Sequence, residues 1–246
     1  MATKTAVDIP ALLLVGGKGT RLRSVVSSVP KPLASVGDQP FLELLVRQLR
    51  HQGIRRLVMC SGYLADQIEG KFGDGRAWDM KIEYSREQHP LGTAGALKLA
   101  QRHLQGDSDF LVMNGDSFLE MDFSPLIRLR RERNGLASMA VVPVSDAGRY
   151  GTVQVDADDR VIGFTEKTGT NAGGTINAGL YVFHRGIFEH IPEGPVSLER
   201  DVFPRVLDRG VYALEQRGMF VDIGTPEDYA SAQALYGRLR DAASRG

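Results

Sequence analysis

Residues 12–32 read LLLVGGKGTRLRSVVSSVPKP, and this stretch decides what kind of fold and site the chain can form. An apolar run typical of a buried strand passes into a glycine-rich turn and then into a cluster of positive charge. The glycines are Gly16, Gly17 and Gly19, and the cations are Lys18, Arg21, Arg23 and Lys31. Because glycine lacks a Cβ, the N–H groups of such a turn can close on phosphate oxygens, while Arg and Lys supply charge. The stretch therefore predicts a phosphate site directly after a strand.

Two common glycine loops do not fit these residues. The dinucleotide-binding fingerprint needs a third glycine three residues after the second, but from Gly17 the chain reads GKGTRL, with Leu22 at that position. The Walker pattern needs Gly-Lys followed by Ser or Thr, and here Gly19 follows Lys18. Because glycines alone are weak indicators, a basic loop that simply faces solvent stays open as the alternative.

The composition excludes several classes of protein. A chain of 246 residues suits one α/β domain or two small ones, and its 30 basic residues balance 30 acidic ones. This balance argues against a general nucleic-acid or anionic-membrane surface. The single cysteine, Cys60, excludes an intrachain disulfide and a cysteine-cluster zinc site. With no apolar run of about 18 residues and no signal-like N-terminus, we expect a cytoplasmic protein that does not bind membranes.

Strands and helices alternate over the first 135 residues. We expect strands at 12–15, 56–60, 81–84 and 110–113, and helices at 40–53, 64–72, 93–104 and 124–135. The helix at 40–53 has apolar residues at helical spacing, Pro40 near its start and Gly53 after its end. Ser124 and Pro125 suit the N-cap and the first helical position. Such alternation favours a mostly parallel sheet with helices on both faces.

The pattern changes after a strand at 137–143. We expect a hairpin from 152–155 and 161–165, strands at 176–183 and 211–214, and a helix after Ser197; Thr225 should cap a final helix to about Arg240. Without a linker or repeat, this predicts one Rossmann-like α/β domain over 1–246, with an antiparallel portion added to a mixed, mostly parallel sheet. Arg21 and Lys31 then lie beyond the C-terminal end of the first strand, where open α/β sheets bind ligands.

Two aspartates follow short apolar strands. Asp116 follows FLVM in the segment NGDS, and Asp222 lies in FVDIGTPEDY, between a short strand and a glycine turn. Two carboxylates at a sheet edge can share one Mg²⁺ with substrate phosphates. Each alone also fits an ordinary turn aspartate, but the pair, together with the first loop, favours a magnesium site.

The string GGKGTRL, followed closely by PKP, resembles the signature of the sugar nucleotidylyltransferases. These enzymes join a nucleoside triphosphate to a sugar 1-phosphate and release pyrophosphate. The resemblance extends along most of the chain and implies a nucleotide-binding half at about 1–140 and a sugar-phosphate-binding half at about 141–246. It implies that the glycine turn and Thr20 wrap the triphosphate, that Arg21 and Lys31 contact its phosphates, and that Asp116 and Asp222 carry Mg²⁺. The catalytic residues are then Arg21, Lys31 and Asp116.

The same resemblance assigns a sugar pocket in the second half. In GFTEKTG, Lys167 matches a lysine that binds the sugar phosphate and Glu166 a glutamate that binds a sugar hydroxyl. Without the resemblance, these two residues read as an exposed ion pair. Two further segments match the pocket, and from the residues alone both are ordinary turns; they contribute Tyr150, Gly151, Asn177 and Gly179.

The segment EQHPLGTAGA, residues 87–96, resembles the family's base-recognition loop. Gly92 permits close approach to the base, and Thr93 either caps the following helix or contacts the nucleotide. We expect Glu87 to select guanine, because a carboxylate only accepts hydrogen bonds and guanine presents two adjacent donors. A surface glutamate without a role is the alternative.

The subfamily is the finer question. The first loop, SGYLADQIEGKFGDG and the Glu87 loop are most similar to bacterial D-glycero-α-D-manno-heptose 1-phosphate guanylyltransferases, which supply GDP-heptose for capsule or surface-layer glycans. Mannose 1-phosphate guanylyltransferases, many with a C-terminal extension not expected here, and glucose 1-phosphate uridylyl- or thymidylyltransferases are the alternatives. Rivals from other classes are a catalytically silent regulatory relative and a nucleotide-sugar glycosyltransferase. The expected partners are small-molecule substrates, not nucleic acid, and homo-oligomerisation stays open.

Overall fold

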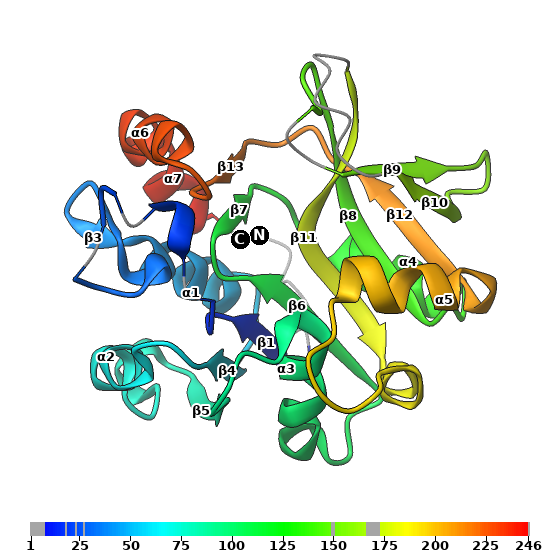
Figure 1. The fold of residues 1–246 in the computed structure, drawn as a ribbon, viewed down its shortest axis with the longest axis horizontal. Helices are drawn as coiled ribbons and strands as arrows, with labels where there is room; N and C mark the ends of the chain where they lie inside the picture. The colour runs from blue at the N-terminus through cyan, green and yellow to red at the C-terminus, as the bar shows by residue number, and fades with distance from the viewer. Residues whose placement is uncertain are drawn as a thin grey trace, which may run out of the picture.

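A computed structural model of the protein describes residues 8–17, 19–22, 24–26, 28–148, 151–165 and 173–245. Within these residues, the chain builds a nine-stranded mixed sheet whose main path runs β10-β9-β11-β6-β1-β4-β5. Strand β8 pairs with β11 and β12, off this path (Figure 1). Every helix in the described part of the chain is too short or too polar to cross a membrane.

The first half of the chain forms the parallel part of the sheet. Strands β1 (Ala11–Leu14), β4 (Arg56–Ser61), β5 (Lys81–Arg86) and β6 (Asp109–Asn114) lie parallel, with β1 between β4 and β6. The connecting helices are α1 (Phe41–His51), α2 (Ala65–Phe72), α3 (Gly92–Ala100) and α4 (Ser124–Glu132). The predicted alternation is thus confirmed.

The second half adds mainly antiparallel strands. Long β11 (Gly174–His184) runs antiparallel to both β6 and β8 (Ala137–Val144), and β9 (Thr152–Val155) with β10 (Val161–Thr165) forms the predicted hairpin. Strand β12 (Val211–Glu215) then joins β8 in parallel. The second half is joined to the first through the β11–β6 pairing, so one continuous sheet carries both halves.

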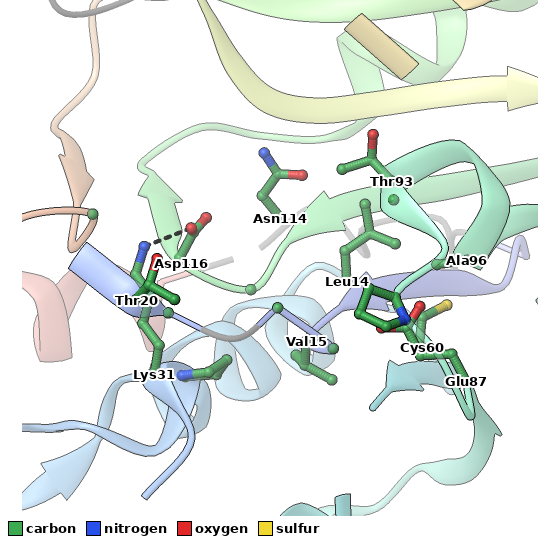
Figure 2. Close-up of a pocket in the computed structure, with 18 of the residues that line it drawn as sticks. Leu14, Val15, Thr20, Lys31, Cys60, Glu87, Thr93, Ala96, Asn114 and Asp116 are labelled. Carbon is green, nitrogen blue, oxygen red and sulfur yellow. Dashed lines mark hydrogen bonds and ion pairs between the residues drawn. The ribbon is translucent and has the colours of Figure 1, made fainter. Parts of the chain in front are cut away.

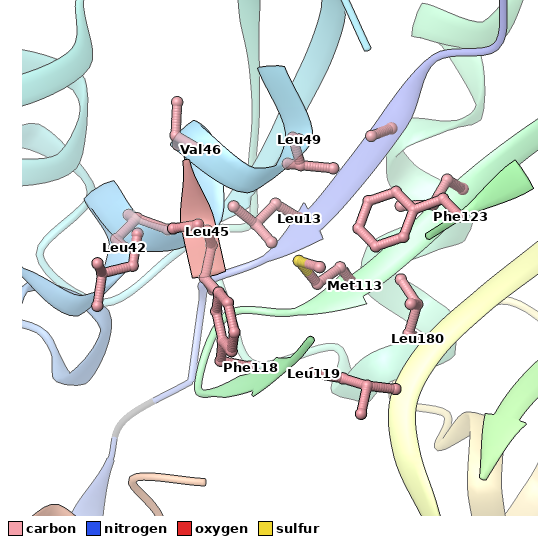
Figure 3. Close-up of a cluster of buried hydrophobic side chains, with 14 of the residues drawn as sticks. Leu13, Leu42, Leu45, Val46, Leu49, Met113, Phe118, Leu119, Phe123 and Leu180 are labelled. Carbon is pink, nitrogen blue, oxygen red and sulfur yellow. The ribbon is translucent and has the colours of Figure 1, made fainter. Parts of the chain in front are cut away.

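Each face of the sheet buries its own core, because side chains alternate along a strand. On β1, Leu13 faces a core shared with α1, α2, α4 and α7 (Tyr236–Ala243), while Leu12 faces a second core shared with α3 and α5 (Phe203–Val206). Figure 3 shows part of the first core, where Leu13 and Met113 meet the apolar face of α1. This packing fixes the ends of β1 and β6, where the cavity described below opens.

Two predicted helices differ in detail. The terminal helix is divided into α6 (Pro226–Ala234) and α7 (Tyr236–Ala243), because the backbone leaves helical angles at Leu235. The break lets α7 bury Leu239 against the core beside α1. Ser124 is the first residue of α4 rather than its N-cap, and its N–H donates to Asp122 Oδ1 at 2.9 Å. Thr225 caps α6 as predicted, since its hydroxyl accepts from the N–H of Asp228.

A small second sheet brings the segment that contains Asp116 next to the segment that contains Asp222. Strand β7 (Ser117–Leu119) pairs antiparallel with β13 (Phe220–Asp222), and Ser117 lies opposite Asp222. The N–H of Ile223 donates to the carbonyl of Asp116 at 2.9 Å. Asp116 and Asp222, 106 positions apart in the sequence, are therefore neighbours. A second small hairpin joins β2 (Ser35–Val36) to β3 (Gln39–Pro40) ahead of α1.

Candidate active site

A cavity of about 380 Å³ lies at the C-terminal ends of β1 and β6. Its wall includes the described part of the glycine turn, the Glu87 loop, the start of α3 and the NGD segment, which begins at the last residue of β6 (Figure 2). The predicted residues in this wall are Gly16, Gly17, Gly19, Thr20, Arg21, Lys31, Glu87, Gly92, Thr93 and Asp116. The structure thus gathers the predicted nucleotide-binding residues into one hollow at the expected edge of the sheet.

The glycine turn needs its glycines for close packing. Gly19 has a φ of +57°, and a Cβ there would lie 2.7 Å from Lys31 Cβ. A Cβ on Gly16 would meet Glu87 Oε1 at 2.9 Å. Because Gly16 and Gly19 have no side chain, Glu87 can pack directly on one end of the turn and Lys31 on the other. The predicted cations Lys18 and Arg23 lie outside the described residues.

Lys31 and the two aspartates form a charged cluster. Lys31 Nζ lies 2.7 Å from Asp116 Oδ2, and the lysine side chain is only 11% exposed. Asp222 Oδ1 accepts from the N–H of Gly224, a residue of the cavity wall, at 2.6 Å. Burial and the negative charge of Asp116 raise the pKa of Asp222 to about 6, although Lys31 opposes the rise. The two aspartates are therefore partly shielded from solvent, and their negative charges repel one another.

This donor set fits a hard divalent cation. Mg²⁺ in proteins is commonly held by one or two carboxylates and completed by substrate phosphates and water. Among the described residues, no cluster of three or more His, Cys, Asp and Glu side chains could hold a metal without such help. Two mutually repelling carboxylates beside a cavity whose wall includes Arg21 and Lys31 match that arrangement, since a bound cation would relieve their repulsion.

Glu87 occupies the far end of the cavity from this cluster (Figure 2). Its Oε2 accepts from the N–H of Leu91 at 3.0 Å, and its side chain fills the space above Gly16 and Gly62. Burial raises the pKa of this carboxyl, while the Leu91 N–H opposes the rise. Glu87 is thus a half-buried acceptor fixed in the cavity wall and not a freely solvated glutamate.

The start of α3 contradicts one of the two expectations for Thr93, that it caps the helix. Helix α3 begins at Gly92, so Thr93 lies inside its first turn and does not cap it. The Thr93 hydroxyl instead accepts from the N–H of Leu198 at 2.8 Å and donates to Glu199 Oε2 at 3.0 Å. Gly92 has a φ of +72°, and a Cβ there would lie 2.5 Å from the Val196 carbonyl oxygen. Packing against 196–199 therefore requires this glycine, whatever else it contacts.

The sugar-side residues lie partly beyond what the structure describes. Tyr150, Glu166 and Lys167 fall outside the described residues, and Gly151 directly precedes β9. Asn177 and Gly179 lie on β11 where its pairing with β8 is irregular. Gly179 has a φ of +73° and packs on Asn114, whose side chain belongs to the cavity wall. The Asn177–Gly179 bend is thus adjacent to the cavity wall without being part of it.

Several cavity residues were not predicted as site residues. Asn114 ends β6 directly before the predicted GD segment, so its place after a buried strand could have suggested it. Cys60 lines the hollow, and burial raises the pKa of its thiol to about 12, which keeps it protonated and unreactive as expected for a buried cysteine. Glu199 is not part of the cavity wall but accepts a hydrogen bond from Thr93, which is; it comes from SLERDVF, which carries no recognisable signal beyond a helix start.

The chain is similar in sequence to known proteins over most of its length. The family model described as nucleotidyl transferase matches residues 10–238. A mannose-1-phosphate guanylyltransferase of Mycobacterium tuberculosis is 38% identical over 97% of this chain and 68% of its own length. A D-glycero-alpha-D-manno-heptose 1-phosphate guanylyltransferase of Aneurinibacillus thermoaerophilus is also 38% identical, over 91% of this chain and 96% of its own length. The chain spans 64% of a second mannose relative, a probable enzyme of Oryza sativa.

Solved structures agree with the fold. HddC from Yersinia pseudotuberculosis, complexed with GMP-PN, is 34% identical, with a TM-score of 0.83 over 93% of this chain and 99% of that one. A putative glucose-1-phosphate thymidylyltransferase from Bacillus anthracis is 24% identical, with a TM-score of 0.83 over 95% of this chain and 96% of its own. At that identity the second likeness concerns the fold alone.

Proposed function

The chain belongs to the nucleotidyl transferase family, and from that premise we propose that it transfers a guanylyl group from GTP to a sugar 1-phosphate and releases pyrophosphate. The observation that carries the proposal is the convergence at one cavity of the glycine turn, Lys31 and Asp116, with Asp222 next to Asp116 behind the cavity wall. The sequence likeness to guanylyltransferases from several organisms supports the choice of nucleotide.

The chemistry of Glu87 supports guanine as the base of the nucleotide. Guanine presents donors at N1 and N2, while uracil and thymine each present one donor on the corresponding edge. The Glu87 carboxylate lines the end of the cavity away from Lys31 and Asp116, so a nucleotide can place its base there and its phosphates at the cluster. One of its oxygens already accepts from Leu91, which fixes the carboxylate for this task.

The reaction is an in-line displacement at the α-phosphorus. An oxygen of the sugar 1-phosphate forms the new P–O bond, and the bond from the α-phosphorus to the oxygen shared with the β-phosphate breaks, so pyrophosphate leaves with that electron pair. The attacking phosphate is already ionised at neutral pH, so no general base is required. The protein's contribution is to hold two polyanions together and to stabilise developing charge.

Three basic side chains divide this work in the proposal. Lys31, held at Asp116, and Arg21, exposed on the cavity wall, stabilise the triphosphate and its leaving group. The glycine turn presents its N–H groups to the phosphates. Lys167 holds the attacking phosphate and Glu166 a sugar hydroxyl, with Tyr150, Gly151, Asn177 and Gly179 forming the rest of the sugar pocket. The halves at about 1–140 and 141–246 thus bind nucleotide and sugar phosphate, respectively.

Asp116 and Asp222 are the proposed magnesium ligands. When bound there, Mg²⁺ would neutralise phosphate charge and act as a Lewis acid. Two contacts support this assignment, since Lys31 partly neutralises Asp116 and the N–H of Gly224 orients Asp222. Lys31 therefore both binds phosphate and holds a ligand carboxylate in place.

For the sugar, we propose D-glycero-α-D-manno-heptose 1-phosphate, which would place the enzyme in GDP-heptose synthesis for surface glycans in the cytoplasm. The support is the similarity of the first loop and the Glu87 loop to heptose enzymes, and the relative of that name is matched over 96% of its length. Mannose 1-phosphate is the second candidate, because a relative named for that sugar is equally identical.

The proposal is tested by supplying the purified chain with GTP, heptose 1-phosphate and MgCl₂ and identifying products by mass. Equimolar GDP-heptose and pyrophosphate are expected, and Lys31→Ala should abolish both while leaving the circular dichroism spectrum unchanged. GTP binding without any product from heptose or mannose 1-phosphate would instead identify a catalytically silent relative. Transfer of sugar from a GDP-sugar without pyrophosphate release would identify a glycosyltransferase.

A further inference from the structure

The short hairpin that follows Lys31 lies against the last helices of the chain, α6 and α7 (Figure 1). Its strands, β2 and β3, form a sheet of their own with two residues in each strand. An isolated two-stranded hairpin is at best marginally stable in water, so this one needs support from the rest of the fold. Val36 supplies part of that support by burying its side chain in the core beside α1. The polar groups of the turn are held from α6 and α7.

The side chain of Gln233, on α6, binds the hairpin with both ends of its amide. Its Oε1 accepts from the N–H of Gly37 at 2.9 Å, and its Nε2 donates to the Ser35 carbonyl oxygen at 2.6 Å. Because one of these backbone groups is a donor and the other an acceptor, they fix which way round the amide lies. One side chain therefore satisfies two polar groups of the turn and joins it to α6.

Two tyrosines contact the hairpin on either side of Gln233. Tyr229, four residues before it, donates its hydroxyl at 2.5 Å to the same carbonyl oxygen that Gln233 Nε2 contacts. Tyr236, three residues after it, donates to Asp38 Oδ1, and its ring occupies the space in which Gly37 would carry a Cβ. Spacings of four and three residues place side chains on one face of a helix. We call these three side chains, Tyr229, Gln233 and Tyr236, the C-terminal clamp.

Backbone hydrogen bonds at Ala34 join the clamped hairpin to Lys31. The N–H of Ala34 donates to the Lys31 carbonyl oxygen at 3.0 Å, and the Ala34 carbonyl oxygen accepts from the N–H of Phe41 at 2.9 Å. Lys31 is the first residue of the short 3₁₀ turn Lys31–Leu33, and Phe41 is the first residue of α1. Displacement of the hairpin would therefore also displace the turn that carries Lys31.

The helix that carries Gln233 begins at the charged cluster. The N–H of Gly224 donates to Asp222 Oδ1 at 2.6 Å, and Thr225 caps α6 directly afterwards. A Cβ on Gly224 would lie 3.7 Å from Lys31 Nζ, so the start of α6 is close to the lysine. One helix thus begins beside Lys31 and Asp222 and, further along, holds the hairpin that follows Lys31.

We propose that Gln233 is a positioning residue, which acts through the hairpin to set Lys31 against Asp222 for contact with the phosphates of a bound nucleotide. This role rests on the proposed function, because there Lys31 binds the triphosphate. Lys31 and Asp222 come from opposite ends of the chain, and α6 and the hairpin connect them. The clamp acts only through the hairpin, since the part of the cavity wall that the structure describes contains none of its three side chains.

The test measures GTP binding by titration calorimetry in MgCl₂, without a sugar phosphate, in two backgrounds. In the wild-type background, Gln233→Ala should weaken GTP binding by about fivefold, and Tyr229→Phe, which removes one hydroxyl, by about twofold. In the Lys31→Ala background, neither substitution should weaken binding further, because the clamp acts through the lysine. A merely structural role would cause the same loss in both backgrounds. That result, or no loss in the wild-type background, would overturn the proposal.

Hydrogen exchange reports on the hairpin itself. The amides of Ala34 and Phe41, whose hydrogen bonds do not involve Gln233, should exchange about fivefold faster in Gln233→Ala, while the amides of β6 keep their wild-type rates. Unchanged exchange at both amides would overturn the proposal, because the substitution would then have left the segment after Lys31 in place.

Ser231→Ala is the matched control on α6, because the Ser231 hydroxyl donates to the Glu227 carbonyl oxygen within the same helix at 3.0 Å. It should change neither GTP binding nor exchange, and Tm is recorded for every variant. Calorimetry needs no turnover, so a catalytically silent protein is tested in the same way. Failure of the wild type to bind GTP would instead refute the proposed function, and exchange at Ala34 and Phe41 would still decide whether the clamp holds the hairpin.

Discussion

Replacing Glu87 by glutamine tests base selection, because the change removes the charge of the side chain but can keep its hydrogen bond with the Leu91 N–H. The Leu91 N–H that now donates to Glu87 Oε2 can donate equally to the glutamine Oε1, so the loop keeps its anchor. The glutamine Nε2 then takes the place of Glu87 Oε1, beside Gly16. A donor thereby replaces an acceptor toward the base edge of guanine, which itself presents donors. Folding should survive, because burial already raises the pKa of this carboxyl and so penalises its charged form.

The magnitude follows from the bonds lost. A hydrogen bond to a charged group contributes roughly 1.5–3 kcal/mol, which corresponds to about 10- to 100-fold in kcat/KM for GTP. UTP should lose much less, so the GTP-to-UTP ratio of kcat/KM falls by about tenfold or more in a pyrophosphate-release assay. The exposed Glu132→Gln on α4 serves as the matched control. An unchanged ratio in Glu87→Gln, with normal turnover, would refute the role of Glu87 in choosing the base.

Further predictions concern the charged cluster, the turn and pH. Lys31→Ala and Asp116→Ala should each lower kcat by about 10²-fold or more with the fold intact, measured by pyrophosphate release and circular dichroism; near-normal kcat in either would remove that residue from the mechanism. Gly19→Ala should lower the free energy of unfolding by about 1 kcal/mol or more, because φ is +57° and the methyl group would meet Lys31, and urea titration would show it. Glu87 has a raised pKa, so as pH falls its carboxylate is neutralised above the range of an ordinary glutamate. The kcat/KM for GTP should then fall as pH falls, while the free energy of unfolding increases. Glu87→Gln should remove the contribution of Glu87 from both profiles and leave that of Asp222, whose pKa is also raised.

Much of the architecture was predictable because the hydrophobic periodicity of short, continuous stretches indicates it. The apolar residues of β1, β4 and β6 and the helical spacing of α1 lie in continuous stretches, so their periodicity indicates strands and a helix without knowledge of the fold. The predicted parallel sheet and antiparallel addition are both confirmed. The break between α6 and α7 at Leu235 was missed, because no proline follows Pro226 in this stretch and the break goes with the packing of α7 against α1.

The site divides in the same way. The glycine turn and the residue after β6 were recognisable because their chemistry is local, and the structure places Gly19, Lys31 and Asp116 together. The contact of Thr93 with Glu199, 106 positions away, depends on how the short helix η6 (Leu198–Val202) packs against α3. No local pattern in the sequence indicates it. Residues whose roles come from such distant contacts can be found only in the folded chain.

The most direct test of the account is pyrophosphate release with GTP, ATP, UTP, CTP and dTTP, each crossed with heptose, mannose and glucose 1-phosphates, with and without MgCl₂. The account predicts magnesium-dependent release with GTP and heptose 1-phosphate well above every other pair. Release with another pair would keep the mechanism and contradict the specificity proposed here. No release with any pair, together with no binding of GTP, would contradict the central claim that this cavity is a guanylyltransferase active site.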